Sequence, residues 1–228
     1  MFAALLLLIT LSSVDVASAQ TVEELTEQCQ QGNAGGCFYL GVMYVEGTGV
    51  RQDAVTAVEL FRKACDGQYA AACFNLGVAY KQGEGVTQDL FKAAEPYRKA
   101  CDGNIADGCQ QLGWMYEKGT GVTRDFFKAV EFYRKACDGQ NAKGCSNLGL
   151  MYRQGIGVTQ DAVKARALYR QACEGQYAGG CFNLGVMYNN GTGVRQSDDE
   201  ARKFFGKACD LKNEKGCQNY ALLKTGKK

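Results

Sequence analysis

The sequence of 228 residues contains no histidine, and this absence limits its chemistry more than any other feature of its composition. Histidine is the usual proton shuttle at neutral pH and the commonest zinc ligand, so a histidine-based zinc hydrolase is excluded. Proline is almost absent as well, with the single Pro96 against 29 glycines. The formal net charge is only +2, which gives no reason to expect nucleic acid or an anionic membrane surface as a partner.

Long hydrophobic runs are also missing. The apolar run at residues 2–11 has the length of a signal-peptide core and is too short to span a bilayer. It is followed at residues 17–19 by Ala-Ser-Ala, the small-residue pattern that signal peptidases cleave. We therefore predict that residues 1–19 are a signal peptide, that no transmembrane segment is present, and that the mature chain is secreted or periplasmic.

Cysteine, by contrast, is abundant, and all 12 cysteines follow the predicted signal peptide. They form pairs whose members are eight residues apart, and the pairs recur every 36 residues. An even number of cysteines behind an export signal indicates disulfides, whereas a metal site would need closer cysteine spacings or histidines. We predict the disulfides Cys29–Cys37, Cys65–Cys73, Cys101–Cys109, Cys137–Cys145, Cys173–Cys181 and Cys209–Cys217, and no metal site.

The eight-residue spacing also predicts local structure. On one continuous helix eight residues span about 12 Å, but disulfide-bonded Cα atoms lie within roughly 7 Å of each other. A turn must therefore separate the two cysteines, and we expect it to be supplied by the glycines at Gly67, Gly103, Gly139 and Gly175. Each disulfide would then connect the end of one repeat to the start of the next.

Other residues keep the same 36-residue period. Leu-Gly pairs such as Leu76-Gly77 are followed after four residues by a tyrosine such as Tyr80, and then by a GxGV segment. Their spacing predicts one helix that ends at the glycines. A second helix is predicted to start at the N-cap residues Asp53, Asp89, Asp125, Asp161 and Ser197. Two helices per unit at a fixed period indicate an all-α solenoid, which we expect to be a right-handed α/α superhelix.

The predicted domain organisation follows from this register. Residues 20–228 form one repeat domain, with five repeats that begin near residues 33, 69, 105, 141 and 177. A cap helix at residues 20–31 precedes them and a second cap helix at residues 213–224 follows them. Pro96 falls inside a predicted second helix, where we expect it to bend the helix axis.

The string CFNLGVMY, followed by GTGVRQ and by a helix that ends in RKACDG, closely resembles the Sel1-like repeat, a relative of the tetratricopeptide repeat. With a disulfide in every unit, the chain resembles the Helicobacter cysteine-rich protein family in particular. The resemblance implies an adaptor that holds peptides or other proteins. It also implies an alternative, because this branch is described as penicillin-binding with weak β-lactamase activity, so a β-lactam or a fragment derived from peptidoglycan is a possible ligand.

The residues themselves do not support a catalytic site. A serine β-lactamase needs an activated serine, commonly in an S-x-x-K motif. After the predicted signal peptide the chain has only Ser146 and Ser197, and neither is followed by a lysine three residues later. We therefore assign no catalytic residue and no cofactor.

A binding site is better supported. One repeat position in the first helices carries amide side chains, one residue away from the buried Cys-Leu-Tyr face. A row of amides can hydrogen-bond the backbone of an extended peptide, although such side chains can also simply satisfy neighbouring backbone groups. With Trp114 as an aromatic anchor, the predicted peptide- or protein-binding groove of this monomeric scaffold contains Asn75, Gln111, Asn147, Asn183 and Asn219.

Overall fold

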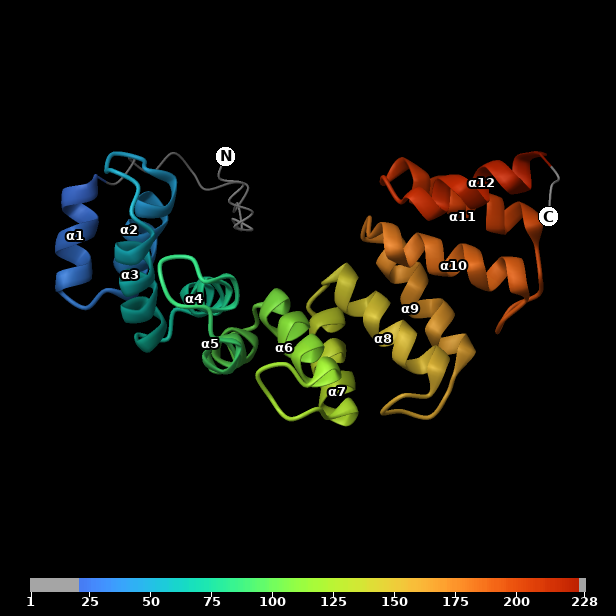
Figure 1. The fold of residues 1–228 in the computed structure, drawn as a ribbon, viewed down its shortest axis with the longest axis horizontal. Helices are drawn as coiled ribbons and strands as arrows, with labels where there is room; N and C mark the ends of the chain where they lie inside the picture. The colour runs from blue at the N-terminus through green and yellow to red at the C-terminus, as the bar shows by residue number, and fades with distance from the viewer. Residues whose placement is uncertain (1–20, 226–228) are drawn as a thin grey trace. The chain divides into compact units, whose positions relative to one another are not determined.

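The computed structural model describes residues 21–225, and this part of the chain consists of helices joined by turns and loops, with no strand (Figure 1). The helices are α1 (Val22–Gln30), α2 (Ala34–Glu46), α3 (Ala54–Asp66), α4 (Ala70–Gln82), α5 (Leu90–Asp102), α6 (Ala106–Lys118), α7 (Phe126–Asp138), α8 (Ala142–Gln154), α9 (Ala162–Glu174), α10 (Ala178–Asn190), α11 (Asp198–Asp210) and α12 (Glu214–Thr225). The predicted all-α solenoid is confirmed. The predicted signal peptide at residues 1–19 lies outside the described residues.

The helices fall into two compact units, which we describe separately. Unit 1 contains α1 to α5 and unit 2 contains α6 to α12. Each repeat has a first helix (α2, α4, α6, α8 or α10) and a second helix (α3, α5, α7, α9 or α11). Within each unit every helix packs against the next one in the chain.

The predicted N-caps of the second helices are confirmed. The carboxylate of Asp53 accepts hydrogen bonds from the backbone N–H groups of Val55 at 2.9 Å and Thr56 at 3.2 Å. Asp89, Asp125, Asp161 and Ser197 cap their helices with the same kind of side-chain bond. These contacts satisfy backbone donors that have no partner within the helix, so each second helix begins at its capping residue.

An aromatic ring fills the space between the two helices of each repeat. In the third repeat the Tyr133 ring of α7 lies against Gly113 of α6, so closely that a Cβ atom added to Gly113 would be 2.6 Å from the ring. Tyr133 is fully buried, with Ala129 and Ala136 buried beside it on the same helix. The Leu-Gly pair in each first helix therefore provides the flat surface on which this ring packs, and the small alanines let the helices approach.

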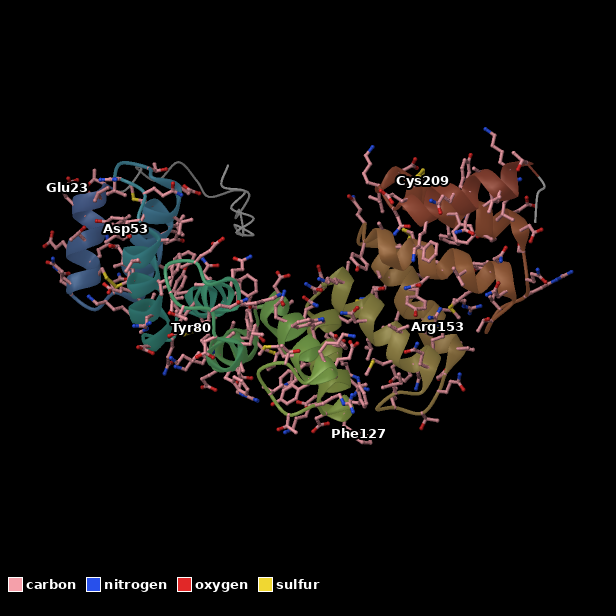
Figure 2. All side chains as sticks on the ribbon, in the orientation of Figure 1. Glu23, Asp53, Tyr80, Phe127, Arg153 and Cys209 are labelled. Carbon is pink, nitrogen blue, oxygen red and sulfur yellow. A yellow bond between two sulfur atoms is a disulfide. The ribbon has the colours of Figure 1, made fainter. Side chains whose placement is uncertain are left out.

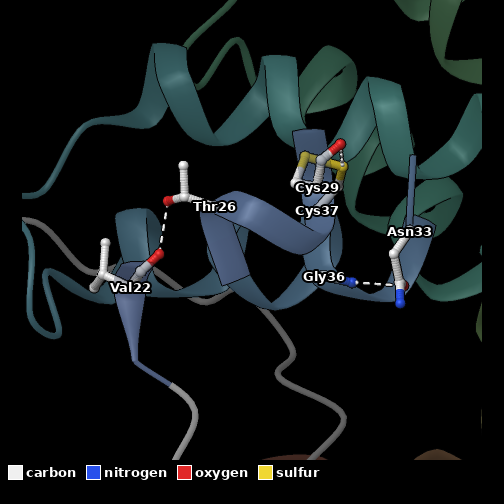
Figure 3. The surroundings of a disulfide bond; sticks show 6 residues. All are labelled: Val22, Thr26, Cys29, Asn33, Gly36 and Cys37. Carbon is white, nitrogen blue, oxygen red and sulfur yellow. Dashed lines mark hydrogen bonds between the residues drawn. A yellow bond between two sulfur atoms is a disulfide. The ribbon is translucent and has the colours of Figure 1, made fainter. Parts of the chain in front are cut away.

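Within each unit, disulfides connect neighbouring repeats. Figure 3 shows Cys29 at the end of α1 bonded to Cys37 at the start of α2, beside the Asn33 side chain that accepts a hydrogen bond from the Gly36 N–H. The Cα atoms of the bonded cysteines are 4.4 to 4.6 Å apart, so a turn separates them as the spacing predicts. The further disulfides with both partners in one unit are Cys65–Cys73, Cys137–Cys145, Cys173–Cys181 and Cys209–Cys217. Cys101 and Cys109 are also disulfide-bonded.

The glycines lie in these turns as predicted, but they do not supply the left-handed backbone conformation there. Gly67 and Gly139 have ordinary negative φ angles, and the residues in the left-handed conformation are the following ones, Gln68 and Gln140. A Cβ atom at Gly67 would instead be 2.7 Å from the Cβ atom of Ala34, in the preceding first helix. Glycine is needed here because the end of the second helix approaches the start of the first helix of the same repeat closely, and Gly103 and Gly175 have the same environment.

Pro96 lies inside α5, and the helix continues through it from Leu90 to Asp102. Proline has no backbone N–H, so the carbonyl of Lys92 loses its usual helical partner there. The Pro96 ring is buried, in the position where Leu60 and Phe132 are buried in neighbouring repeats. It therefore serves as a core side chain, and a bend of the axis remains a prediction.

Candidate binding face of the first helices

The first helices of unit 2 lie next to one another. α6 packs against α8, and α8 packs against α10, whereas the second helices α7, α9 and α11 make no comparable contact with each other. The first helices therefore form the more tightly packed side of unit 2. We call the predicted groove residues on this side the first-helix face, and in unit 2 they are Gln111, Trp114, Asn147, Asn183 and Asn219.

These residues are partly buried, so their side chains lie at the surface without extending far into solvent. Asn147 and Asn183 occupy the same position on the adjacent helices α8 and α10. Gln111 and Trp114 lie together on α6, and both side chains already take part in contacts within the chain. Asn75 belongs to α4 in unit 1, so it is described apart from the others.

The amides of the row differ in their hydrogen bonds. The Asn219 amide donates to the backbone carbonyl of Lys215 at 2.8 Å, which is the local role that polar side chains often have on helices. Asn147 interacts with the Tyr133 hydroxyl. Within the described residues, Asn75 and Asn183 have no side-chain hydrogen bond. The amides available to a ligand are therefore a subset of the predicted row.

The third repeat contains a polar cluster at the edge of this face. The Tyr133 hydroxyl donates a hydrogen bond of 2.7 Å to a carboxylate oxygen of Glu117, four residues after Gly113 on α6. The other oxygen of Glu117 pairs with Lys118. Burial, together with the bond to Glu117 and its negative charge, raises the pKa of Tyr133, and Asn147 lowers it by a smaller amount. The hydroxyl thus remains protonated and donates to an internal carboxylate.

The fourth repeat has the same arrangement without the carboxylate. The Tyr169 ring of α9 packs against Gly149 of α8, and the residue four positions after Gly149 is Arg153. The Tyr169 hydroxyl is buried and has no hydrogen-bond partner among the described residues. Burial raises the pKa of Tyr169 to about 12, although the positive charge of Arg153 opposes the shift. Figure 2 labels Arg153, which lies near the C-terminal end of α8.

The charge of the first helices changes along unit 2. α6 carries Asp107, which accepts a hydrogen bond of 2.8 Å from the Asn141 amide and whose pKa is raised by burial. α8 carries Lys143 and Arg153 and no acidic residue, and α10 carries no charged residue. The part of the face formed by α8 and α10 is therefore positively charged.

Two apolar features were not predicted from the sequence. In unit 1 the rings of Phe38, Tyr39 and Tyr69 contact one another, with centroids 4.8 to 6.5 Å apart, and Tyr39 is 43% exposed. Burial and a hydrogen bond with Tyr39 raise the pKa of Tyr69 to about 12. The second feature is a set of exposed apolar residues near the N-termini of second helices, where Figure 2 labels Phe127. Its members recur every 36 residues and are Val55, Phe91, Phe127 and Val163.

The two serines of the described chain have structural positions. Ser146 is only 4% exposed, and Ser197 accepts a hydrogen bond from the Glu200 N–H as the N-cap of α11. No group of histidine, cysteine or acidic side chains in residues 21–225 is arranged to hold a metal ion. None of the helices in the same range is both long and apolar enough to cross a membrane.

Comparison with known proteins agrees with this architecture. A protective antigen of uropathogenic Escherichia coli strains with an SLR fold is 33% identical, with a TM-score of 0.84 over 89% of this chain and 43% of that chain. This chain therefore spans less than half the length of that relative. A Sel1 repeat protein from Oxalobacter formigenes is 26% identical, with a TM-score of 0.80 over 86% of this chain and 82% of that chain.

Helicobacter pylori cysteine rich protein B is 34% identical over 57% of this chain and 94% of that chain, with a TM-score of 0.48. No protein of curated function matches this chain. The family model described as Sel1 repeat matches five consecutive segments, residues 34–69, 70–105, 106–141, 142–177 and 178–213. These segments cover most of the sequence, and the chain therefore belongs to the Sel1 repeat family.

Proposed function

We propose that this disulfide-bonded Sel1 repeat protein is a monomeric scaffold that binds an extended segment of a partner peptide or protein on the first-helix face of unit 2. The observation that carries the proposal is the Asn183 amide, which is partly exposed and has no partner in the described chain, beside Asn147 on the adjacent helix. An amide offers both a donor and an acceptor, so it can pair with the backbone of an extended segment.

The rigidity of the site supports the same function. Both helices that carry these amides start at a disulfide, Cys137–Cys145 for α8 and Cys173–Cys181 for α10. Their hydrogen-bonding groups are thus held in place before a partner arrives, which reduces the entropy lost on binding. The disulfides also support a secreted or periplasmic location, because such bonds persist in oxidising compartments.

The test uses a phage-displayed library of random peptides and the full, oxidised chain. Peptides recovered on the wild-type protein are synthesised and titrated calorimetrically against the wild type and the Asn183→Ala variant. We expect the substitution to weaken binding about fivefold, which corresponds to one hydrogen bond of roughly 1 kcal/mol. The matched control is Gln171→Ala, which removes an exposed amide from the second helix α9 and should leave the affinity unchanged. Recovery of no binding peptide, or equal affinity for wild type and Asn183→Ala, would overturn the proposal.

A further inference from the structure

Two repeats of unit 2 differ in a way that points to the chemistry of the partner. In both repeats a tyrosine of the second helix packs on a glycine of the first helix, and a charged residue follows that glycine by four positions. In the third repeat that residue is Glu117, which accepts the hydrogen bond of the Tyr133 hydroxyl at 2.7 Å. In the fourth repeat it is Arg153, and the Tyr169 hydroxyl is buried with no partner.

A buried hydroxyl without a partner is unusual, because leaving it unpaired is unfavourable. Arg153 cannot accept a hydrogen bond, since its guanidinium carries only donors. Its side chain makes no ion pair or hydrogen bond with any other described residue. Asn183 stands to Tyr169 as Asn147 stands to Tyr133, 36 residues earlier, and its amide is also unpaired. The Arg153 guanidinium, the Tyr169 hydroxyl and the Asn183 amide are thus hydrogen-bond donors at corresponding positions of the fourth repeat, which lacks the acceptor that Glu117 provides in the third repeat.

The third repeat shows which acceptor fits this geometry, because Glu117 supplies a carboxylate there. A carboxylate pairs well with a guanidinium, since the two planar groups form parallel hydrogen bonds. The charge of the surroundings favours the same ligand, as α8 and α10 carry Lys143 and Arg153 and no acidic residue. The Tyr169 hydroxyl is covered in the free chain, so side chains around it must move to admit the oxygen atom.

We propose that Arg153, Tyr169 and Asn183 bind a carboxylate of the partner segment, an inference that rests on the proposed function. The carboxylate comes either from an aspartate or glutamate side chain or from the C-terminus of the partner. In both cases it takes the place that Glu117 occupies in the third repeat.

The experiment compares two libraries of random peptides panned on the full, oxidised chain. In one library the peptides are embedded in the carrier protein, so that only side chains supply carboxylates; in the other they have free C-termini. Each library is panned in parallel on the wild type and on Arg153→Glu. This variant places a carboxylate beside Tyr169, as in the third repeat, and should therefore fold normally. Arg195→Gln is the matched control, because it removes an exposed arginine from the loop after α10.

We expect peptides selected on the wild type to carry Asp or Glu at one fixed position, or to depend on a free C-terminus. This preference for a carboxylate should disappear on Arg153→Glu and persist on Arg195→Gln. Synthetic peptides should lose about tenfold or more in affinity when their carboxylate is replaced by the amide, and a similar amount on Tyr169→Phe. Enriched peptides without a carboxylate preference would overturn this inference and leave the proposed function intact. Recovery of no peptide from either library would overturn both.

Discussion

Removing the hydroxyl group from two equivalent tyrosines should change the stability of unit 2 in opposite directions. Tyr133→Phe and Tyr169→Phe make the same covalent change at the same repeat position, in rings that are both fully buried. The Tyr133 hydroxyl donates to the carboxylate of Glu117, whose side chain is only 19% exposed, whereas the Tyr169 hydroxyl has no partner. The two variants therefore isolate the contribution of the acceptor.

The magnitude follows from the partners. A hydrogen bond to a charged group contributes about 1.5 to 3 kcal/mol, so Tyr133→Phe should lower the free energy of unfolding by about 2 kcal/mol. An unpaired buried polar group costs about 1 to 3 kcal/mol, so Tyr169→Phe should raise the free energy of unfolding by about 1 kcal/mol. The two variants should therefore differ by about 3 kcal/mol, although each loses only one oxygen atom.

Urea denaturation followed by circular dichroism, with the disulfides intact, measures this difference. Both residues lie in unit 2, so the same unfolding transition is compared even if unit 1 unfolds separately. We expect the midpoint to fall for Tyr133→Phe and to rise for Tyr169→Phe, with unchanged slopes. Equal destabilisation by both substitutions would show that the Tyr169 hydroxyl has a partner, and would refute the reasoning.

Three further predictions concern packing, pH and catalysis. Gly113→Ala should destabilise unit 2 by about 1 to 3 kcal/mol in the same urea assay, because its Cβ atom would be 2.6 Å from the Tyr133 ring. The control is Gly206→Ala, which should be neutral or stabilising because its Cβ atom would have no contact closer than 3.3 Å. Burial raises the pKa of Tyr169 to about 12, whereas a tyrosine in the unfolded chain has a pKa of about 10. The neutral Tyr169 therefore contributes stability that is fully present below about pH 10 and is lost between about pH 10 and 12. The free energy of unfolding of Tyr169→Phe should fall less than that of the wild type over this range, and an equal fall would contradict the assignment. Purified protein should hydrolyse a chromogenic cephalosporin no faster than buffer, because one serine of the described chain is buried and the other caps a helix; saturable turnover that disappears when both serines are changed to alanine would show this to be wrong.

Local features of the fold could be predicted from the sequence because short segments determine them. The N-cap at Asp53 depends on backbone groups two and three residues later, and each disulfide joins residues only eight apart. The role of Gly67 could not be predicted in the same way. Its necessity comes from Ala34, which lies 33 residues earlier and meets it only after the two helices of the repeat have packed together.

The candidate site was only partly predictable for a related reason. The amide row follows from the period of the sequence, but its hydrogen bonds depend on neighbouring helices, so the structure was needed to separate the paired Asn219 from the unpaired Asn183. The Tyr169 environment did leave a signal in the sequence. Aligning the repeats places Glu117 and Arg153 at one position. A basic residue there, beside a buried tyrosine, marks a repeat whose tyrosine hydroxyl lacks an acceptor, and the second repeat, with Lys81 and the unpaired Tyr97 hydroxyl, follows the same rule.

The central claim is that a partner segment binds on the first-helix face, and nuclear magnetic resonance tests it most directly. The full chain is labelled with nitrogen-15, and the side-chain amide signals of Asn147, Asn183 and Gln171 are followed while a peptide selected from the random library is added. The account predicts that the signals of Asn147 and Asn183 move with saturation, while the signal of Gln171 on the second helix α9 does not. Unchanged Asn147 and Asn183 signals, with changes instead around the exposed Phe91 and Phe127, would contradict it and place the binding surface at the N-termini of the second helices.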